Sequence, residues 1–308
     1  MSWIGGYAEW SDDEARTAYL SVAFSWFVDR AAQRALSYRM LGWRVLVGGP
    51  GVFLLQKAKT RHELFDLAEY GTSYPEAILK HNPDATIASR GCPGMGTVKD
   101  PKPCAFCIVP PMEGTSFTLF PDFTPRPILC DNNLSALPTD YQDFIIRRYQ
   151  ESGVRLEDAN SGFEPATFTQ EVYDRWKPLV NAGRGPWRWG YDTTKEGPQA
   201  RRVMSMLRDE PAKRKRPYVL IGNEPFDDCM ARIHECLEAG CEPHVQPEIK
   251  LKADAKRYWV RYDWTYQNLT DVARWVNGAH ARMPWKEYDR HRKNTAEETY
   301  DVQQGLFV

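Results

Sequence analysis

Three cysteines, Cys92, Cys104 and Cys107, lie within sixteen residues of one another in a C-x11-C-x2-C arrangement. Cysteine thiolates bind zinc ions and iron–sulfur clusters, and structural zinc sites normally use four protein ligands. A trio of cysteines leaves one position of a four-ligand centre open. We therefore expect these residues to bind a reactive metal centre rather than a purely structural one.

The sequence around the trio predicts how it is positioned. The apolar run DATIA at residues 84–88 predicts a β-strand, and the Gly- and Pro-rich residues between Arg90 and Glu113 predict a loop presented at its end. Two other interpretations fit the same residues. A three-cysteine zinc loop completed by His81 is one. A redox-active CxxC pair formed by Cys104 and Cys107 in a reducing cytosol is the other.

The motifs SRGCP (89–93), CAFC (104–107) and VPPMEG (109–114) resemble the cluster loop of the radical S-adenosylmethionine (SAM) superfamily, near its methylthiotransferase-like and cobalamin-type branches. The usual spacing is C-x3-C-x2-C, and here the first gap is eight residues longer. The resemblance implies that the trio holds a [4Fe–4S] cluster whose fourth iron binds SAM. It further implies SAM cleavage to a 5′-deoxyadenosyl radical that abstracts hydrogen from substrate, and a flavodoxin- or ferredoxin-type reductant as partner.

Beyond the loop, predicted strands alternate with predicted helices. Thr139 and Thr169 are expected to cap two of these helices, and Gly153 is expected to end the first. Five β units in regular alternation with helices predict a parallel α/β barrel or partial barrel. The resemblance implies a partial (β/α)6 TIM-like barrel over residues 84–275. The predicted strands are 127–134, 154–163, 187–193, 216–225 and 242–251, and the helices are 139–153, 168–183, 196–210 and 227–240.

Residues 1–83 and 276–308 flank this region as predicted extensions. A strand at 18–26, a helix at 29–41 and a strand at 43–49 predict a β-α-β unit with a parallel strand pair. This unit is similar to the Rossmann-like domain of cobalamin-type members. The D-x-H-x-x-G signature for the cobalt ligand is absent, so cobalamin is not predicted.

Polar side chains follow the predicted strands, where the carboxyl ends of parallel strands meet at the active face. Each of them is also typical of a helix cap or turn. The resemblance implies that residues 131–133 contact the amino group of SAM, that Asp192 holds its ribose, and that the Gly222-Asn223-Glu224 segment and Phe106 lie at its adenine. No catalytic residue is predicted. The predicted cofactor-binding residues are Phe106, Asp131, Asn132, Asn133, Asp192, Asn223, Glu224 and Gln246.

Composition limits the classes of partner. The 40 basic and 41 acidic residues give a net charge of −1, so no global field favours nucleic acid. The clusters at Lys213–Arg216 and Arg290–Lys293 leave nucleic acid open as a substrate. A zinc-stabilised nucleic-acid-binding protein is therefore the alternative function. We predict a cytoplasmic protein, because no signal peptide, no apolar run of about 18 residues and no disulfide framework is evident.

Other cysteine and aromatic residues have two interpretations. Cys229 and Cys236 are seven residues apart and share a predicted helical face, so with Cys241 they form either a second cluster site or part of the core. Cys130 lies inside a predicted strand and is expected in the core. The large aromatic residues near strand ends line a substrate cavity or fill the core; they are Trp187, Trp189, Tyr191 and Trp264.

Overall fold

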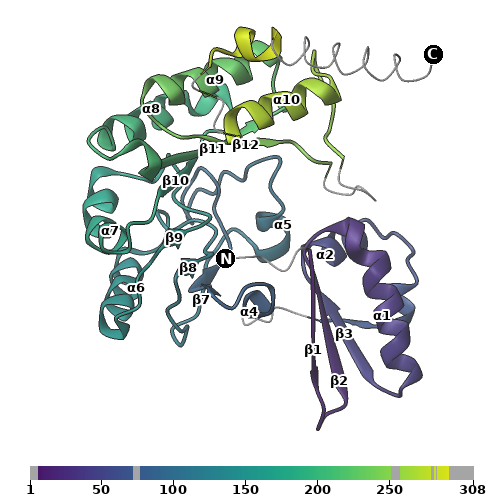
Figure 1. Cartoon of the computed structure of the whole chain (residues 1–308). Coiled ribbons are helices and arrows are strands. Elements are labelled where there is room, and N and C mark those ends of the chain that lie inside the picture. Colours follow the sequence, from purple (N-terminus) through teal and green to yellow (C-terminus); the bar gives the residue numbers. More distant parts are fainter. Residues whose placement is uncertain (1–5, 72–76, 251–256, 279–280, 282, 291–308) are drawn as a thin grey trace, which may run out of the picture. The chain divides into compact units, whose positions relative to one another are not determined.

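The computed structural model describes residues 6–71, 77–250, 257–278, 281 and 283–290 of the chain (Figure 1). The chain divides into two compact units, Met1–Trp189 with Ile249–Arg257, and Gly190–Glu248 with Tyr258–Val308. The domain limits predicted at residues 83 and 275 stay predictions. Most of the predicted C-terminal extension, including the RHRK run beyond Arg290 and the GLFV tip, lies outside the described residues.

The first unit contains most of the elements. Its strands are β1 (Tyr7–Asp12), β2 (Thr17–Val22), β3 (Arg44–Gly48), β4 (Glu69–Tyr70), β5 (Ala85–Thr86), β6 (Ser89–Arg90), β7 (Thr118–Leu119), β8 (Ile128–Leu129) and β9 (Asp158–Ala159). Its helices are η1 (Ser25–Phe27), α1 (Val28–Met40), α2 (Pro50–Lys57), α3 (Leu64–Leu67), α4 (Ala77–His81), α5 (Val109–Glu113), α6 (Thr139–Ser152) and α7 (Gln170–Gly183).

The strand β10 (Trp187–Gly190) crosses the boundary between the units. The remaining elements belong to the second unit. They are η2 (Thr194–Glu196), α8 (Gly197–Met206), η3 (Ala212–Arg214), β11 (Lys215–Ile221), α9 (Phe226–Glu238), β12 (His244–Pro247) and α10 (Tyr266–Asn277).

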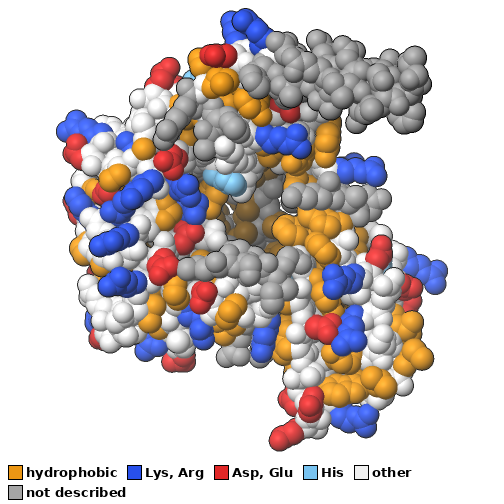
Figure 2. Space-filling model, in the orientation of Figure 1, with side chains coloured by type: hydrophobic (Ala, Val, Ile, Leu, Met, Phe, Trp, Pro, Cys, Tyr) orange, Lys and Arg blue, Asp and Glu red, His pale blue; other side chains and the backbone are white. Residues whose placement is uncertain are grey.

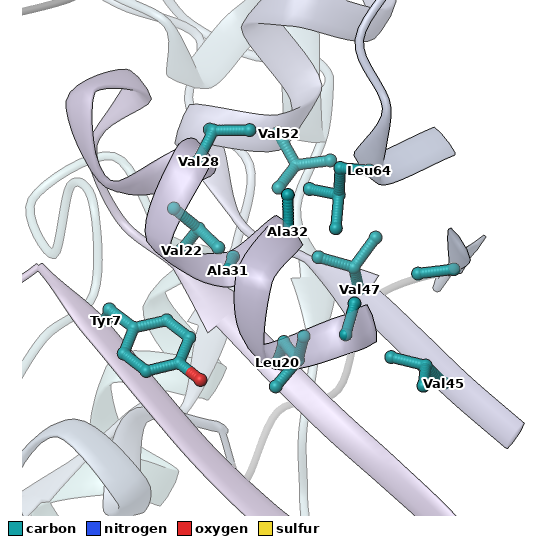
Figure 3. Close-up of a cluster of buried hydrophobic side chains, with 12 residues drawn as sticks. Tyr7, Leu20, Val22, Val28, Ala31, Ala32, Val45, Val47, Val52 and Leu64 are labelled. Atoms are coloured by element: carbon teal, nitrogen blue, oxygen red, sulfur yellow. The ribbon is translucent and has the colours of Figure 1, made fainter. Parts of the chain in front are cut away.

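The N-terminal part of the first unit is a four-stranded sheet in the order β1-β2-β3-β4. The β1–β2 pair is antiparallel, whereas β2–β3 and β3–β4 are parallel. The helix α1 packs on the sheet because Val28, Ala31, Ala32 and Ala35 recur at helical spacing and are buried (Figure 3). The predicted β-α-β unit with a parallel strand pair is therefore confirmed as β2-α1-β3.

Two features of this sheet differ from the sequence prediction. The strand β1 was not predicted. The strand predicted to continue to Trp26 ends at Val22, and a 3-10 turn follows. The reason lies in the turn after β3: Gly49 has φ +97°, and a Cβ on Gly51 would collide with the backbone of Phe24. The chain after Val22 therefore bends over a glycine turn instead of extending the sheet.

The middle of the first unit holds a parallel sheet in the order β5-β8-β9. An isolated parallel bridge joins Phe163 to Trp189. The hydroxyl of Thr169 accepts the Val172 N–H, so its predicted cap on α7 is confirmed. The predicted cap at Thr139 is wrong, because Pro138 occupies that position and Thr139 is already helical. Gly153 ends α6 in the left-handed conformation, as predicted.

The helices α6 and α7 enclose an aromatic core. The indole of Trp176 donates a hydrogen bond of 2.9 Å to the side-chain oxygen of buried Gln142, which joins the two helices. The rings of Phe163, Phe168 and Trp187 pack together beside Trp176. Trp187 and Trp189 are fully buried, so both residues belong to the core and not to a substrate cavity.

In the second unit, β11 and β12 pair in parallel, with Tyr218 opposite His244 and Ile221 opposite Pro247. The helix α9 buries Cys229 and Cys236 on one face, as its spacing predicts, and Cys241 is buried too. Tyr191 and Trp264 are also core residues. The chain is therefore a mixed α/β protein with small parallel sheets, and the described strands form no closed barrel.

Candidate functional site

The three predicted ligands lie on one irregular segment of the first unit, residues 91–108, here called the cysteine loop, which connects β6 to α5. The loop was predicted to continue to Glu113, but its last residues form the short helix α5. Gly91 and Gly94 have φ values of +92° and +68°. A Cβ at either position would collide with a backbone carbonyl, of Ser116 or Lys102 respectively, so the loop path requires both glycines.

The cysteine sulfurs accept hydrogen bonds from the protein. The Gly94 N–H lies 3.3 Å from Sγ of Cys92, and the Val109 N–H lies 3.4 Å from Sγ of Cys107. The Asn133 amide nitrogen lies 3.9 Å from Sγ of Cys92. N–H donors directed at sulfur stabilise the thiolate form that binds metals, and around bound clusters they set the reduction potential.

The thiol of Cys92 is also affected by its neighbours electrostatically. Burial raises its pKa most, negative charge on Cys107 raises it further, and the hydrogen bonds from Gly94 and Asn133 oppose the shift. A raised thiol pKa means that metal binding must release a proton at neutral pH, so metal affinity depends on pH.

The geometry does not form a single-ion site. Among the residues that the structure describes, no three His, Cys, Asp or Glu side chains are placed to hold one metal ion. A tetrahedral zinc site brings thiolates to within about 4 Å of one another, whereas a four-iron cube binds each thiolate at a separate corner. In the described residues the trio is therefore not arranged around a single ion. His81, the predicted fourth zinc ligand, is buried with its Nε2 2.9 Å from the Ser21 hydroxyl.

Asp131, which follows β8, supports the start of the cysteine loop. Its carboxylate accepts the Ala88 N–H at 2.9 Å and the Ser89 hydroxyl. Asp131 is fully buried, and this burial raises its pKa to about 6. In the structure it acts as an internal anchor of the β5–β6 connection.

Asn132 and Asn133 contact the loop itself. Asn132 donates to Glu113 at 2.6 Å, and the same carboxylate accepts the Gly91 N–H at 3.0 Å. Asn133 donates to the Gly94 carbonyl at 3.4 Å, and its oxygen accepts the Ser135 hydroxyl at 3.0 Å. The residues predicted to contact SAM therefore brace the cysteine loop, and Glu113 joins the two ends of that loop.

Phe106, between the paired cysteines, is half-buried on the same loop. The structure thus brings together Phe106 and residues 131–133 with the cysteine trio in the first unit. The other predicted cofactor-binding residues, Asp192, Asn223, Glu224 and Gln246, belong to the second unit.

Within the second unit, the polar residues after β10 and β11 form a network around Arg232 of α9. Its guanidinium donates to the carbonyls of Tyr191 and Leu220 at 2.6 and 2.9 Å, and its Nε lies 3.3 Å from the Glu224 carboxylate. The Arg232 side chain is only 1% exposed. A buried guanidinium with acceptors on two strands fixes the strand ends relative to the helix.

The predicted residues of the second unit connect to this network. Asn223 donates to the Asp192 carbonyl at 2.5 Å, and the Asp192 carboxylate accepts the Leu220 N–H at 3.1 Å. The Glu224 carboxylate accepts hydrogen bonds from the backbone N–H and the hydroxyl group of Thr194. The structure therefore brings Asp192, Asn223 and Glu224 together. Gln246 lies exposed on β12.

Sequence reasoning missed Glu113 and Arg232 as organising residues. Glu113 stands in the quoted VPPMEG motif, and its position before Gly114 was the available signal. No sequence signal marked Arg232, because an arginine in an amphipathic helix normally faces solvent.

The basic cluster Lys213–Arg216 is mostly engaged within the second unit. Lys215 is buried and donates to the Ala239 carbonyl at 3.0 Å, while Arg214 and Arg216 pair with Glu210 and Glu242 at 3.3 Å. On the face drawn in Figure 2, basic and acidic side chains are interspersed. The basic cluster Lys213–Arg216 is therefore poorly suited to binding the phosphate backbone of a nucleic acid.

Among the described residues, no helix has the length and apolar character needed to cross a membrane. The seven cysteines are all described, and none forms a disulfide. Comparison of the chain with protein-family models finds no matching family, and comparison with curated proteins finds no relative.

Proposed function

We propose that the cysteine loop holds a [4Fe–4S] cluster through Cys92, Cys104 and Cys107, and that the chain is a radical SAM enzyme. The observation that carries this proposal is the set of N–H groups from Gly94 and Val109, 3.3 and 3.4 Å from the sulfurs of Cys92 and Cys107. Sulfurs with such donors on a loop fixed at a strand end suit a cluster whose potential the protein must tune.

Residues outside the trio keep the loop in place. Glu113 accepts hydrogen bonds from Gly91 and from Asn132, so the entry to the loop is tied to its exit and to the end of β8. Asn133 orients the Cys92 sulfur and the Gly94 carbonyl from the other side. These contacts limit movement of the thiols, which a functional metal site requires.

When bound, a four-iron cluster with SAM at its open iron supplies one-electron reductive cleavage of the sulfonium and hydrogen abstraction from a substrate. Asn132 and Phe106 are the half-buried first-unit residues that we propose for SAM contact. Asp131 is fully buried, and we assign it an anchoring role instead. The assignments of Asp192, Asn223, Glu224 and Gln246 stay predictions.

The same proposal includes a partial (β/α)6 barrel, a flavodoxin- or ferredoxin-type reductant and a cytoplasmic location. The partial barrel is supported by the parallel pairing of β5, β8 and β9 and of β11 with β12.

The test is anaerobic purification and reconstitution of the full chain with iron and sulfide. We expect iron binding, absorption near ~400 nm, and release of 5′-deoxyadenosine from SAM after chemical reduction. Replacement of Cys92, Cys104 and Cys107 by alanine should abolish all three signals. Cys130→Ala, which changes a buried cysteine outside the loop, should keep them.

Metal analysis of the purified protein would detect the outcome that contradicts this proposal. A colourless protein with about one zinc per chain and no iron would replace this proposal by a structural zinc loop. Undiminished SAM cleavage in the triple variant would exclude the loop as the cluster site.

A further inference from the structure

An open hollow of about 540 Å³ lies in the N-terminal part of the first unit, away from the cysteine loop in sequence. Residues of β1, α1 and α4 line it. Its volume falls within the range of small-molecule sites, about 300–1,000 Å³. Nothing in the proposed radical chemistry uses these residues.

The helix α1 supplies one wall of this hollow. Arg30, Gln33, Arg34 and Ser37 line it at spacings of three, four and seven residues, so they form one polar face of the helix. The apolar face of α1 packs on the sheet. The orientation of the four side chains is therefore fixed by the burial of the opposite face.

The charges on the hollow do not cancel. Its lining includes three cations and one carboxylate, that of Glu9 on β1. Arg34 pairs with Glu9, its Nε lying 3.0 and 2.9 Å from the two carboxylate oxygens. Although burial opposes it, hydrogen bonds from Arg34 and Tyr7 lower the pKa of Glu9, so this single negative charge is already matched.

Among the described residues, two cations of the lining have no direct contact with an acidic side chain, although the charge of Arg30 also lowers the pKa of Glu9. Neither Arg30 nor Lys80 forms an ion pair with an acidic side chain in the described part of the chain. Each instead lies over an aromatic ring, Arg30 at 5.5 Å from the centre of Tyr7 and Lys80 at 5.8 Å from that of Trp10. Aromatic contacts hold both cations at the hollow and leave their N–H groups available. The chain as a whole has a net charge of −1, so this excess of positive charge is local.

We propose that this hollow binds a phosphate group, carried by a small molecule or by the 5′ end of a nucleic acid. A phosphate monoester has a charge of about −1.5 to −2 at neutral pH, which matches the two unpaired cations. Arginine binds phosphate through its planar fork, and lysine adds a point charge from the α4 side. The proposal is independent of the cluster.

The experiment titrates the full-length protein, by calorimetry at low salt, with three probes. They are inorganic phosphate, inorganic pyrophosphate, and a 12-nucleotide single-stranded RNA with and without a 5′-phosphate. Arg30→Gln and Lys80→Gln should each weaken binding at least about tenfold, since each removes a charge-assisted contact. The matched controls Arg39→Gln on α1 and Lys57→Gln on α2, where Lys57 also lies over a ring, should change it little.

Gln33→Lys adds a cation to the same wall and should tighten binding several-fold, a gain that an unfolded protein cannot give. A preference for the 5′-phosphorylated RNA over both the same RNA without that phosphate and inorganic phosphate identifies a nucleic acid end as the source. A preference for the small anions identifies a metabolite. The proposal is overturned if no probe binds, or if the controls weaken binding as much as Arg30→Gln and Lys80→Gln.

Discussion

After β8 in the first unit, Asp131 and Asn133 bond to the backbone around the cysteine loop. After β11 in the second unit, Asn223 and Glu224 bond to Arg232 and to neighbouring turns. Both groups of polar residues follow parallel strands. In the first unit they hold a loop that carries three cysteines, whereas in the second unit they hold one another.

This difference distinguishes two roles of polar residues at strand ends, namely bonding to one another and supporting a neighbouring loop. Glu224 has hydrogen-bond partners in Thr194 and an ion-pair partner in Arg232, so its capacity is largely filled by the protein. The Cys92 sulfur accepts the Gly94 N–H at 3.3 Å, and the Asn133 amide nitrogen lies 3.9 Å from it. Where strand-end side chains satisfy each other, a structural role explains them. Where they hold a loop that carries three cysteines, we propose that the loop binds a ligand.

The largest expected effect comes from breaking the second-unit network at its centre. Arg232→Met keeps the aliphatic volume but removes the guanidinium. The change leaves two buried carbonyls without their donor and the Glu224 carboxylate without its ion-pair partner. We expect the free energy of unfolding to fall by about 3–5 kcal/mol. Urea denaturation of the full chain measures this loss.

Arg201→Met is the matched control for that variant. Arg201 of α8 pairs with Glu235 at 3.0 Å, but its side chain is 55% exposed. Loss of an exposed pair should cost less than about 1 kcal/mol. Similar losses in Arg201→Met and Arg232→Met would show that the network does not organise the second unit.

The next effect concerns the first unit and depends on pH. Burial raises the pKa of Asp131 to about 6, so the folded state binds its proton more tightly than the unfolded state does. The stability that this proton contributes is present below pH ~4 and is lost as the pH rises through about 6. Relative to Asp131→Asn, the wild-type protein should lose up to about 3 kcal/mol between pH 4 and pH 7. Parallel stability profiles of the two proteins, measured by urea unfolding, would show that folding does not raise the pKa of Asp131.

The alternation of strands and helices could be predicted from sequence because each element has its own period. Apolar residues at helical spacing located α1, α7 and α9, and the Thr169 hydroxyl marked the start of α7. The antiparallel strand β1 was missed because YAEWSD mixes polar and aromatic residues in an acidic segment. Its position depends on pairing with β2, which local sequence does not reveal.

The cysteine trio could be found from its spacing, but its supports could not. Gly91 and Glu113 are far apart in sequence and meet only through the fold. Arg232 was missed for the same reason, since its acceptors are the carbonyl of Tyr191, just after β10, and that of Leu220 in β11. Backbone acceptors have no sequence signature, so a buried arginine that binds them resembles any surface arginine.

A smaller effect is expected from releasing the loop. Glu113→Ala removes the acceptor shared by the Gly91 N–H and the Asn132 amide, and we expect a loss of about 1–2 kcal/mol in unfolding free energy. Hydrogen exchange at the Gly91 amide should accelerate. Glu151→Ala, on the exposed side of α6, should change stability by less than about 0.5 kcal/mol. Unchanged exchange at Gly91 would show that the loop is held without Glu113.

The smallest expected effect tests whether the side-chain amide of Asn133 changes the pKa of the Cys92 thiol. Asn133→Asp keeps the acceptor for Ser135 but removes the N–H donor near Cys92 and adds negative charge when ionised, and both changes raise the pKa of the Cys92 thiol. Because the thiolate is the reactive form, alkylation of Cys92 in metal-free protein should slow at a fixed pH of 8. Peptide mass spectrometry measures that rate against Asn268→Asp in α10, which should leave it unchanged. If both variants alkylate at the wild-type rate, Asn133 braces only the backbone of the loop, and the sulfur environment depends on the N–H groups of the loop itself.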